Sequence, residues 1–159
     1  MWEIEGDGSL IPGERYDRLS VVTYATHDHD PLRVMWERWM QTIADALAEP
    51  ERLAAARDFA WWEARRLAAW AGFDAPEITP FEKVHGRLLA SLFATNSWIA
   101  ICMITDLFGT AQRFNVPGEV NDGNWSSRIA QPVAQWSADP VLSEKVRSVR
   151  ELIIESGRA

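Results

Sequence analysis

The sequence predicts an α/β fold in which parallel strands are covered by helices on both faces. Two short runs are mainly apolar and carry no charged residue, at Leu19–Tyr24 and at Trp98–Ile104. Runs of this length and composition are typical of strands that are buried on both sides. Helical patterns lie between and after them, so the order is strand, helices, strand, helix. This order favours two parallel strands in one sheet, with most of the mass in helices.

The first helical pattern follows the first strand directly. We expect Asp30 to cap its N-terminus and Pro31 to occupy its first position, where a missing N–H is tolerated. Apolar residues then recur every three or four positions until Pro50, which predicts one buried stripe. The stripe consists of Leu32, Met35, Trp36, Trp39, Met40, Ile43 and Leu47. The paired tryptophans here, and those at positions 61 and 62, fit packing better than sugar binding.

Two further helices are expected before the second strand. An alanine-rich helix extends from about Glu51 to Ala71 and ends at Gly72. The next helix begins with a capping box of Thr79 and Glu82, with Pro80 at its first position. Its apolar face consists of Val84, Leu88, Leu89 and Leu92, and His85 is interpreted as an ordinary helix-face residue.

A long loop and a last helix follow the second strand. The loop covers Gly109–Gln131, and ordered loops of this length are usually functional. Asp139 is expected to cap the last helix, with Pro140 behind it. We expect this helix to bury Val141, Leu142, Val146, Val149 and Ile153.

Composition excludes several classes of protein. The net charge is −7, whereas nucleic-acid binding requires clustered Lys and Arg. No apolar run is long enough to cross a membrane, and the first residues do not form a signal peptide. A single cysteine, Cys102, excludes an internal disulfide and fits a reducing, cytoplasmic setting; its apolar neighbours predict a buried, inert thiol.

The candidate site follows the first strand. The apolar run ends in Thr26-His27-Asp28-His29-Asp30, and ligands bind at the carboxyl ends of parallel strands. His27 and Asp28 are therefore the first candidates, while His29 points away from His27 if the strand continues. An alternative is a small metallohydrolase in which His27, Asp28 and His29 bind a metal, because imidazole and carboxylate are common ligands.

Four motifs resemble the C-terminal part of the 4-α-glucanotransferases, also called amylomaltases or disproportionating enzymes. They are Thr26-His27-Asp28, Asp106-Leu107-Phe108-Gly109, the Arg113–Gly118 segment Arg-Phe-Asn-Val-Pro-Gly, and the Asn124–Arg128 segment Asn-Trp-Ser-Ser-Arg. In that family the first follows the seventh strand of a (β/α)8 TIM barrel, and the others follow the eighth. The resemblance covers roughly residues 1–155. One departure is His29-Asp30-Pro31, where many relatives carry a small polar residue, an acid and Thr.

The resemblance implies retaining transfer of α-1,4-glucan segments between maltooligosaccharides through a covalent intermediate. Asp28 would be the transition-state stabiliser, and His27 and Asn115 would bind the substrate. Asp106 would belong to a structural turn. For Trp125, within the last motif, packing and sugar stacking are equally open. No metal or cofactor is implied, because this chemistry uses two carboxylates about 5 Å apart.

Those two carboxylates would come from strands upstream of Met1. We therefore expect residues 1–159 to be the C-terminal fragment of a glycoside-hydrolase-type (β/α)8 catalytic domain, an incomplete barrel that is inactive alone. The loop character of residues 1–18 supports this expectation. The partner would be the missing N-terminal part of the barrel, in a split enzyme. The alternative is a non-catalytic remnant. Open strand edges and uncovered faces predict that the isolated chain is poorly soluble, molten or oligomeric.

Overall fold

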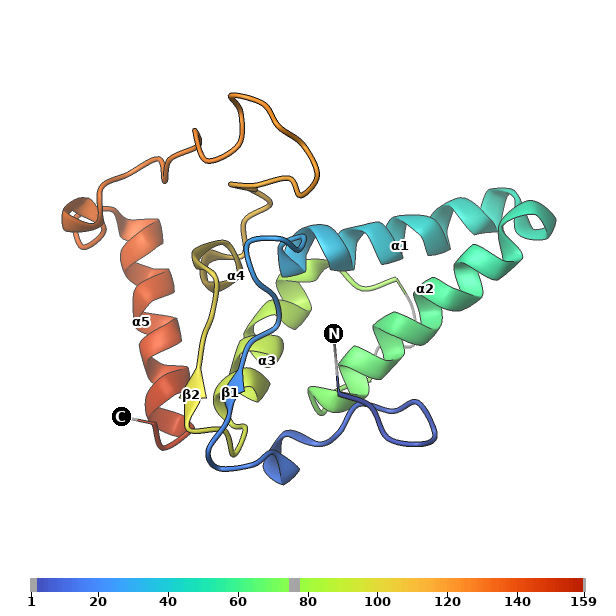
Figure 1. Ribbon diagram of the computed structural model, residues 1–159, viewed down its shortest axis with the longest axis horizontal. Helices are drawn as coiled ribbons and strands as arrows, with labels where there is room; N and C mark the ends of the chain where they lie inside the picture. The colour runs from blue at the N-terminus through green and yellow to red at the C-terminus, as the bar shows by residue number, and fades with distance from the viewer. Residues whose placement is uncertain (1–2, 75–77, 159) are drawn as a thin grey trace.

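Two short parallel strands lie at the centre of the molecule, with helices beside them (Figure 1). The computed structural model describes residues 3–74 and 78–158. Strand β1 (Val21–Val22) pairs with β2 (Ile99–Ala100), so that Val21 lies opposite Ile99 and Val22 opposite Ala100. The predicted parallel pairing is confirmed. Both strands are shorter than predicted, because the chain turns away soon after each pairing and Ile104 already begins helix α4.

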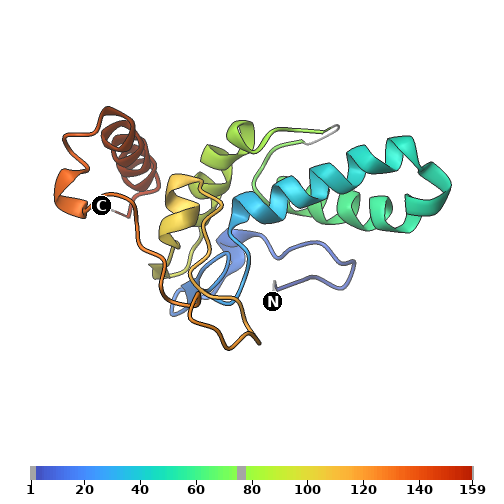
Figure 2. The same ribbon diagram turned by 90° about the horizontal axis from the view of Figure 1, so that it is seen from above.

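The helices follow the predicted order. Their bounds are α1 Leu32–Ala48, α2 Pro50–Trp70, α3 Phe81–Phe93, α4 Ile104–Phe108 and α5 Pro140–Glu155, and two short 3-10 helices are η1 Gly13–Arg15 and η2 Val133–Gln135. Helices α1 and α2 form a long hairpin that extends away from the strands (Figures 1 and 2). Gly72 has a positive φ of 70° just after α2, as expected of a residue that ends a helix.

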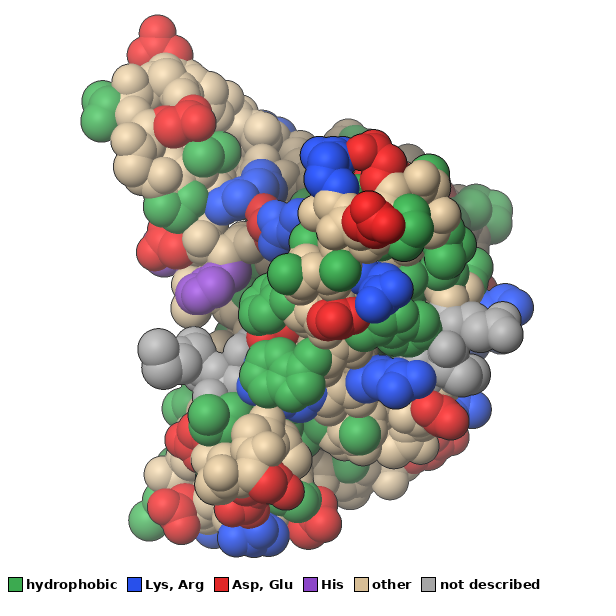
Figure 3. All heavy atoms as spheres, turned by 90° about the vertical axis from the view of Figure 1, so that its right-hand side faces the viewer, with side chains coloured by type: hydrophobic (Ala, Val, Ile, Leu, Met, Phe, Trp, Pro, Cys, Tyr) green, Lys and Arg blue, Asp and Glu red, His purple; other side chains and the backbone are tan. Residues whose placement is uncertain are grey.

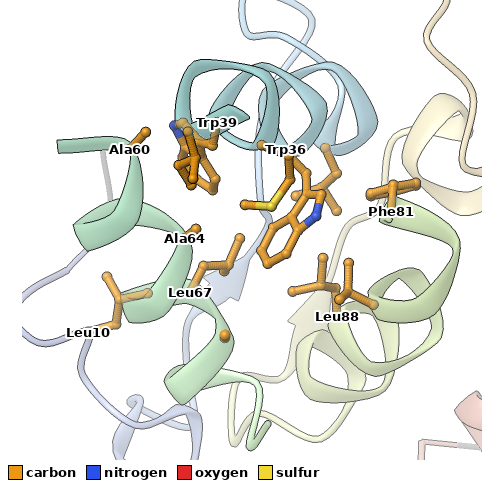
Figure 4. Packing of buried hydrophobic residues seen from close by; sticks show 13 residues of the cluster. Leu10, Trp36, Trp39, Ala60, Ala64, Leu67, Phe81 and Leu88 are labelled. Carbon is orange, nitrogen blue, oxygen red and sulfur yellow. The ribbon is translucent and has the colours of Figure 1, made fainter. Parts of the chain in front are cut away.

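The main hydrophobic core lies between α1, α2 and α3 (Figure 4). Trp36 and Leu88 are fully buried, and the Trp36 indole N–H donates to the carbonyl of Thr79 over 2.7 Å. The predicted stripe of α1 is confirmed in its middle, at Trp36, Trp39, Met40 and Ile43. Leu47 is exposed near the tip of the hairpin, where the other helix no longer covers it. The apolar face of α3 is buried as predicted.

The two faces of the strand pair differ. Val22 is buried against residues of α3 and α5, and Ala100 packs there too. On the other face Leu19 is 87% exposed and Val21 58% exposed, and Ile99 and Ile101 are also exposed. The expectation of strands buried on both faces is therefore wrong within the described residues, because helices cover only one face.

Two of the predicted helix caps are wrong. Pro31, not Asp30, occupies the N-cap of α1, and the buried carboxylate of Asp106 accepts the hydrogen bond from the Leu32 N–H over 2.7 Å. Helix α3 begins at Phe81 with Pro80 at the cap position, one residue later than the predicted capping box requires. The proline side chain has no hydrogen-bond acceptor, so α3 begins without a side-chain cap.

The cap of α5 is confirmed, but its predicted buried face is only partly so. Asp139 accepts hydrogen bonds from Val141 N–H and Leu142 N–H at 2.9 and 3.0 Å. Val149 is buried, whereas Val141 and Val146 are exposed, because α5 contacts the rest of the chain along a narrow strip. In α2, Trp62 is also 47% exposed, under the guanidinium of Arg66. Packing therefore accounts for Trp36 and Trp39 better than for Trp62.

The surface at the α1–α2 end carries charges of both signs. Figure 3 shows acidic, basic and hydrophobic side chains mixed on this face, without a large area of one charge. None of the helices in residues 3–74 and 78–158 has the length and hydrophobicity needed to cross a membrane.

Candidate functional site at the carboxyl ends of the strands

A tight turn carries the histidine and aspartate residues that follow β1. The His29 N–H donates to the carbonyl of Thr26 over 3.0 Å, and His29 Nδ1 lies 3.1 Å from Thr26 Oγ1. This turn redirects the chain from β1 into α1, and it leaves His27 and Asp28 exposed. The strand does not continue through these residues, and His27 and His29 both line one hollow.

Asp28 lies at the centre of a small polar group. Asn115 Nδ2 donates to Asp28 Oδ1 over 2.8 Å, although the two residues are 87 positions apart in the sequence. His27 Nε2 lies 3.3 Å from the same oxygen. The three residues singled out from the sequence therefore meet in space, and the second carboxylate oxygen of Asp28 has no protein partner among the described contacts.

An ion pair between Asp30, next to the turn after β1, and Arg113, in the loop after α4, holds Asn115 near Asp28. Asp30 Oδ1 lies 2.5 Å from Arg113 Nη1, and Asp30 Oδ2 lies 2.7 Å from Arg38 Nη1. Arg113 Nε also donates to the backbone carbonyl of Asn115 over 3.1 Å. Arg113 thus links the residue beside Asp28 to the turn that carries Asp28. Sequence reasoning missed this role, although the Arg-x-Asn spacing contained the signal.

The loop that carries Asn115 is closed by Asn124. Its side chain accepts from the Val116 N–H at 2.9 Å and donates to the Glu119 carbonyl at 2.7 Å. The backbone N–H of the next residue, Trp125, donates to the Phe114 carbonyl over 2.7 Å. Its ring lies against the His27 imidazole with 5.2 Å between centroids. The last two motifs of the sequence therefore converge on the first.

A hollow of about 380 Å³ opens beside this group. It is lined from both loops and from the start of α4; its wall includes His27, His29, Ile104, Arg113, Phe114 and Trp125. A larger hollow of about 1070 Å³ lies between the α1–α2 hairpin and the turn at Asp7 and Gly8. That larger hollow contains none of the motif residues, so we place the candidate site at the smaller one.

Helix α4 lines the hollow and is held in place by contacts with α1, α3 and α5. Burial raises the pKa of Asp106 to about 6, although the hydrogen bond from Leu32 opposes that shift. His85 Nε2 lies 2.6 Å from the Asp106 carbonyl, and burial lowers the pKa of this histidine. Lys145 Nζ donates to the Phe108 carbonyl over 2.6 Å. His85 lies on a face of α3, as interpreted from the sequence, and its ring contacts α4 there.

Cys102 lies between the strands and α4. It is partly buried, and burial raises the pKa of its thiol to about 12. At neutral pH the sulfur is a thiol rather than a nucleophilic thiolate. This agrees with the prediction of an inert cysteine.

The metal-binding alternative does not fit the geometry. Among residues 3–74 and 78–158, no three His, Cys, Asp or Glu side chains come together in a group that could hold a metal ion. His29 turns toward Thr26, while His27 turns toward Asp28 and Trp125. The metallohydrolase built on His27, Asp28 and His29 is therefore not supported.

The chain is an α/β protein with polar side chains beyond the carboxyl ends of its two parallel strands, which is the end of the sheet where ligands bind in folds of this class. Comparison with known proteins gives the family. The sequence model described as 4-alpha-glucanotransferase matches residues 1–133. The chain belongs to the 4-alpha-glucanotransferase family, and the resemblance stated from its motifs is confirmed.

Two relatives show how much of the family's length is present. A protein of Chlamydia muridarum named 4-alpha-glucanotransferase is 27% identical over 157 residues, which cover 91% of this chain and 25% of that protein. One of Chlamydia caviae with the same name is 30% identical over 142 residues, which cover 82% of this chain and 22% of that protein. The chain thus spans about a quarter of the length of the curated relatives it matches.

Proposed function

We propose that this chain provides the part of a 4-α-glucanotransferase site that holds the reacting sugar of an α-1,4-glucan or maltooligosaccharide. The observation that carries the proposal is the convergence of Asn115 and His27 on one carboxylate oxygen of Asp28. These contacts orient Asp28 and leave its other oxygen to accept hydrogen bonds from sugar hydroxyls. A carboxylate also stabilises the positive charge that develops on the sugar ring in the transition state.

Retaining transfer requires two further carboxylates about 5 Å apart, a nucleophile and an acid/base. Two other acids at this end of the strands are engaged in structural contacts: Asp30 binds two arginines, and Asp106 is buried as the cap of α1. We therefore assign the catalytic pair to polypeptide other than the described residues, in the remaining part of a (β/α)8 barrel. By this proposal the isolated chain binds glucan without transferring it.

The binding part of the proposal is tested by titrating the isotope-labelled chain with maltotriose and following NMR signals. We expect the Asn115 side-chain amide to shift, and we expect Asp28→Asn to weaken the response at least about tenfold, as loss of a charged hydrogen bond should. Asp122→Asn is the matched control, because it makes the same change at an exposed aspartate of the neighbouring loop. An equal response of both variants would contradict the proposal.

The catalytic part is tested by maltotriose disproportionation, with glucose and longer oligomers separated by chromatography. The chain is assayed alone and mixed with the C. caviae relative from which the matching quarter has been removed. Activity in the mixture only, abolished by Asp28→Asn, is the expected result. Turnover by the chain alone would overturn the assignment of the missing carboxylates.

A non-catalytic glucan-binding remnant is the second candidate. It is favoured by the engagement of Asp30 and Asp106 in structural contacts. It predicts maltotriose binding at Asn115 without turnover in any mixture. The two experiments together therefore separate the candidates.

A further inference from the structure

Trp125 has a backbone conformation that a tryptophan rarely adopts. Its φ is 63°, and among the described residues it is the one non-glycine with positive φ. A bulky side chain in this left-handed region is strained, and such strain persists only where surrounding contacts impose it. Contacts around Trp125 must therefore hold its backbone in this conformation.

Burial of the side chain does not explain the strained conformation of Trp125. Trp125 is 56% exposed, so it is not packed in a core. A ring that served only as packing would be expected to lie inside, as Trp36 does. The strained backbone instead holds the indole partly open to solvent.

Arg128 holds the turn in place. Its Nη1 lies within hydrogen-bond distance of three successive backbone carbonyls, those of Trp125, Ser126 and Ser127, at 2.8, 3.1 and 3.0 Å. The Trp125 N–H in turn donates to the Phe114 carbonyl. These contacts fix the direction of the indole from both ends of the turn.

The ring is directed toward the candidate site. Its centroid lies 5.2 Å from that of His27, with the two planes inclined by 56°, and His27 contacts Asp28. The indole also forms part of the wall of the hollow of about 380 Å³. An exposed aromatic face beside a hydrogen-bonding carboxylate is the combination that recognises a sugar, whose ring has an apolar face and hydroxyl-bearing edges.

We infer that Trp125 is a sugar-stacking residue, which binds the face of a glucose unit next to the one held by Asp28. The inference rests on the proposed function for the kind of sugar, and it adds a specificity-determining residue to that site. The strained turn clamped by Arg128 is the device that presents the indole.

The test uses Trp125→Gly and Trp125→Phe in the full chain. Glycine suits a positive φ, so Trp125→Gly removes the ring without disturbing the turn. Phenylalanine keeps a smaller stacking face. We expect the dissociation constant for maltotriose to rise about five- to tenfold in Trp125→Gly and less in Trp125→Phe, which corresponds to the loss of one aromatic contact.

Two further variants and a second sugar make the comparison specific. Trp98→Ala removes an even more exposed tryptophan, 64% exposed, that precedes β2 and so lies toward the opposite end of the strands; its binding should be unchanged. Arg128→Met keeps the indole but releases the turn, and it should weaken binding as Trp125→Gly does. Titration with cellotriose, the β-linked analogue, should produce a weaker response at the Trp125 indole than maltotriose does.

The outcomes distinguish the inference from the function on which it rests. If maltotriose shifts neither the Asn115 amide nor the Trp125 indole signal, the proposed function is overturned together with the inference. If Asn115 responds, but the Trp125 indole signal does not and Trp125→Gly binds as tightly as the natural chain, only the stacking role is overturned. Movement of both signals with weakened binding in Trp125→Gly supports both.

Discussion

The helical core and the loops beyond the strands are held together by different forces. In the core, Trp36, Leu88 and their neighbours are buried among apolar side chains, and many packing contacts together stabilise it. In the loops, Asp28 and Trp125 are exposed, and their positions depend on a few polar contacts, among them those of Asn115, Arg113 and Arg128. Substitutions can therefore change the stability of this chain and the geometry of its site separately.

The largest effect is expected in the core. Trp36→Ala removes a fully buried ring and leaves a cavity, which should lower the free energy of unfolding by about 3–5 kcal/mol. Urea unfolding followed by circular dichroism measures this, with Trp98→Ala as the matched control at an exposed tryptophan. Similar losses in the two variants would show that the helical core is not the main source of stability.

The next effect concerns Asp106, which lies between core and site. Its pKa is raised from 3.8 to about 6 on folding, so the folded chain binds its proton more tightly than the unfolded chain does. The contribution of this group to stability is therefore complete below about pH 4 and is lost as the pH rises through about 6. Asp106→Asn keeps the cap acceptor and cannot titrate.

Unfolding measured between pH 4 and pH 7 should show the wild-type stability falling relative to that of Asp106→Asn, by up to about 3 kcal/mol. Asp122→Asn, an exposed change of the same kind, serves as the reference. Parallel pH profiles for wild type and Asp106→Asn would mean that folding does not raise the pKa of Asp106.

A smaller effect is expected where Arg113 links the two loops. Arg113→Met should lower stability by only about 1 kcal/mol, because its ion pair with Asp30 is only partly buried. It should nevertheless abolish the Asn115–Asp28 hydrogen bond. In NMR spectra the Asn115 side-chain amide should then move to the chemical shift of an amide that is not hydrogen-bonded. Arg38→Met removes the other arginine of Asp30 and should leave that signal in place. Movement of the signal in both variants would contradict a specific linking role for Arg113.

The smallest change in stability is expected on the open face of the strands. Val21→Lys should alter the free energy of unfolding by less than about 0.5 kcal/mol, because the side chain is already exposed. It should reduce self-association, since it places a charge in an exposed apolar area. Sedimentation of Val21→Lys and of Val141→Lys tests this; the latter makes the same substitution at an exposed valine of α5, away from the strands. Equal association of both variants would exclude this face as the contact.

Local features of the fold could be predicted because they depend on neighbouring residues. The spacing of apolar residues in α1 and α3, the cap at Asp139 and the end of α2 at Gly72 all follow from short-range patterns. The failure at the cap of α1 involves partners farther along the chain. Asp30 looks like a cap, yet Arg38 and Arg113 bind it, and the cap comes from Asp106, 74 residues from Leu32.

The sequence alone determined the order of the elements, the parallel pairing of the strands and the family, because these depend on local periodicity and on motifs in register. Only the tertiary structure decided which side chains meet: Asn115 with Asp28, Arg113 with Asp30, and Trp125 with His27. It also decided which face of the strands is covered. The physical reason is that contacts between distant loops depend on how helices pack in three dimensions, and no local pattern encodes that packing.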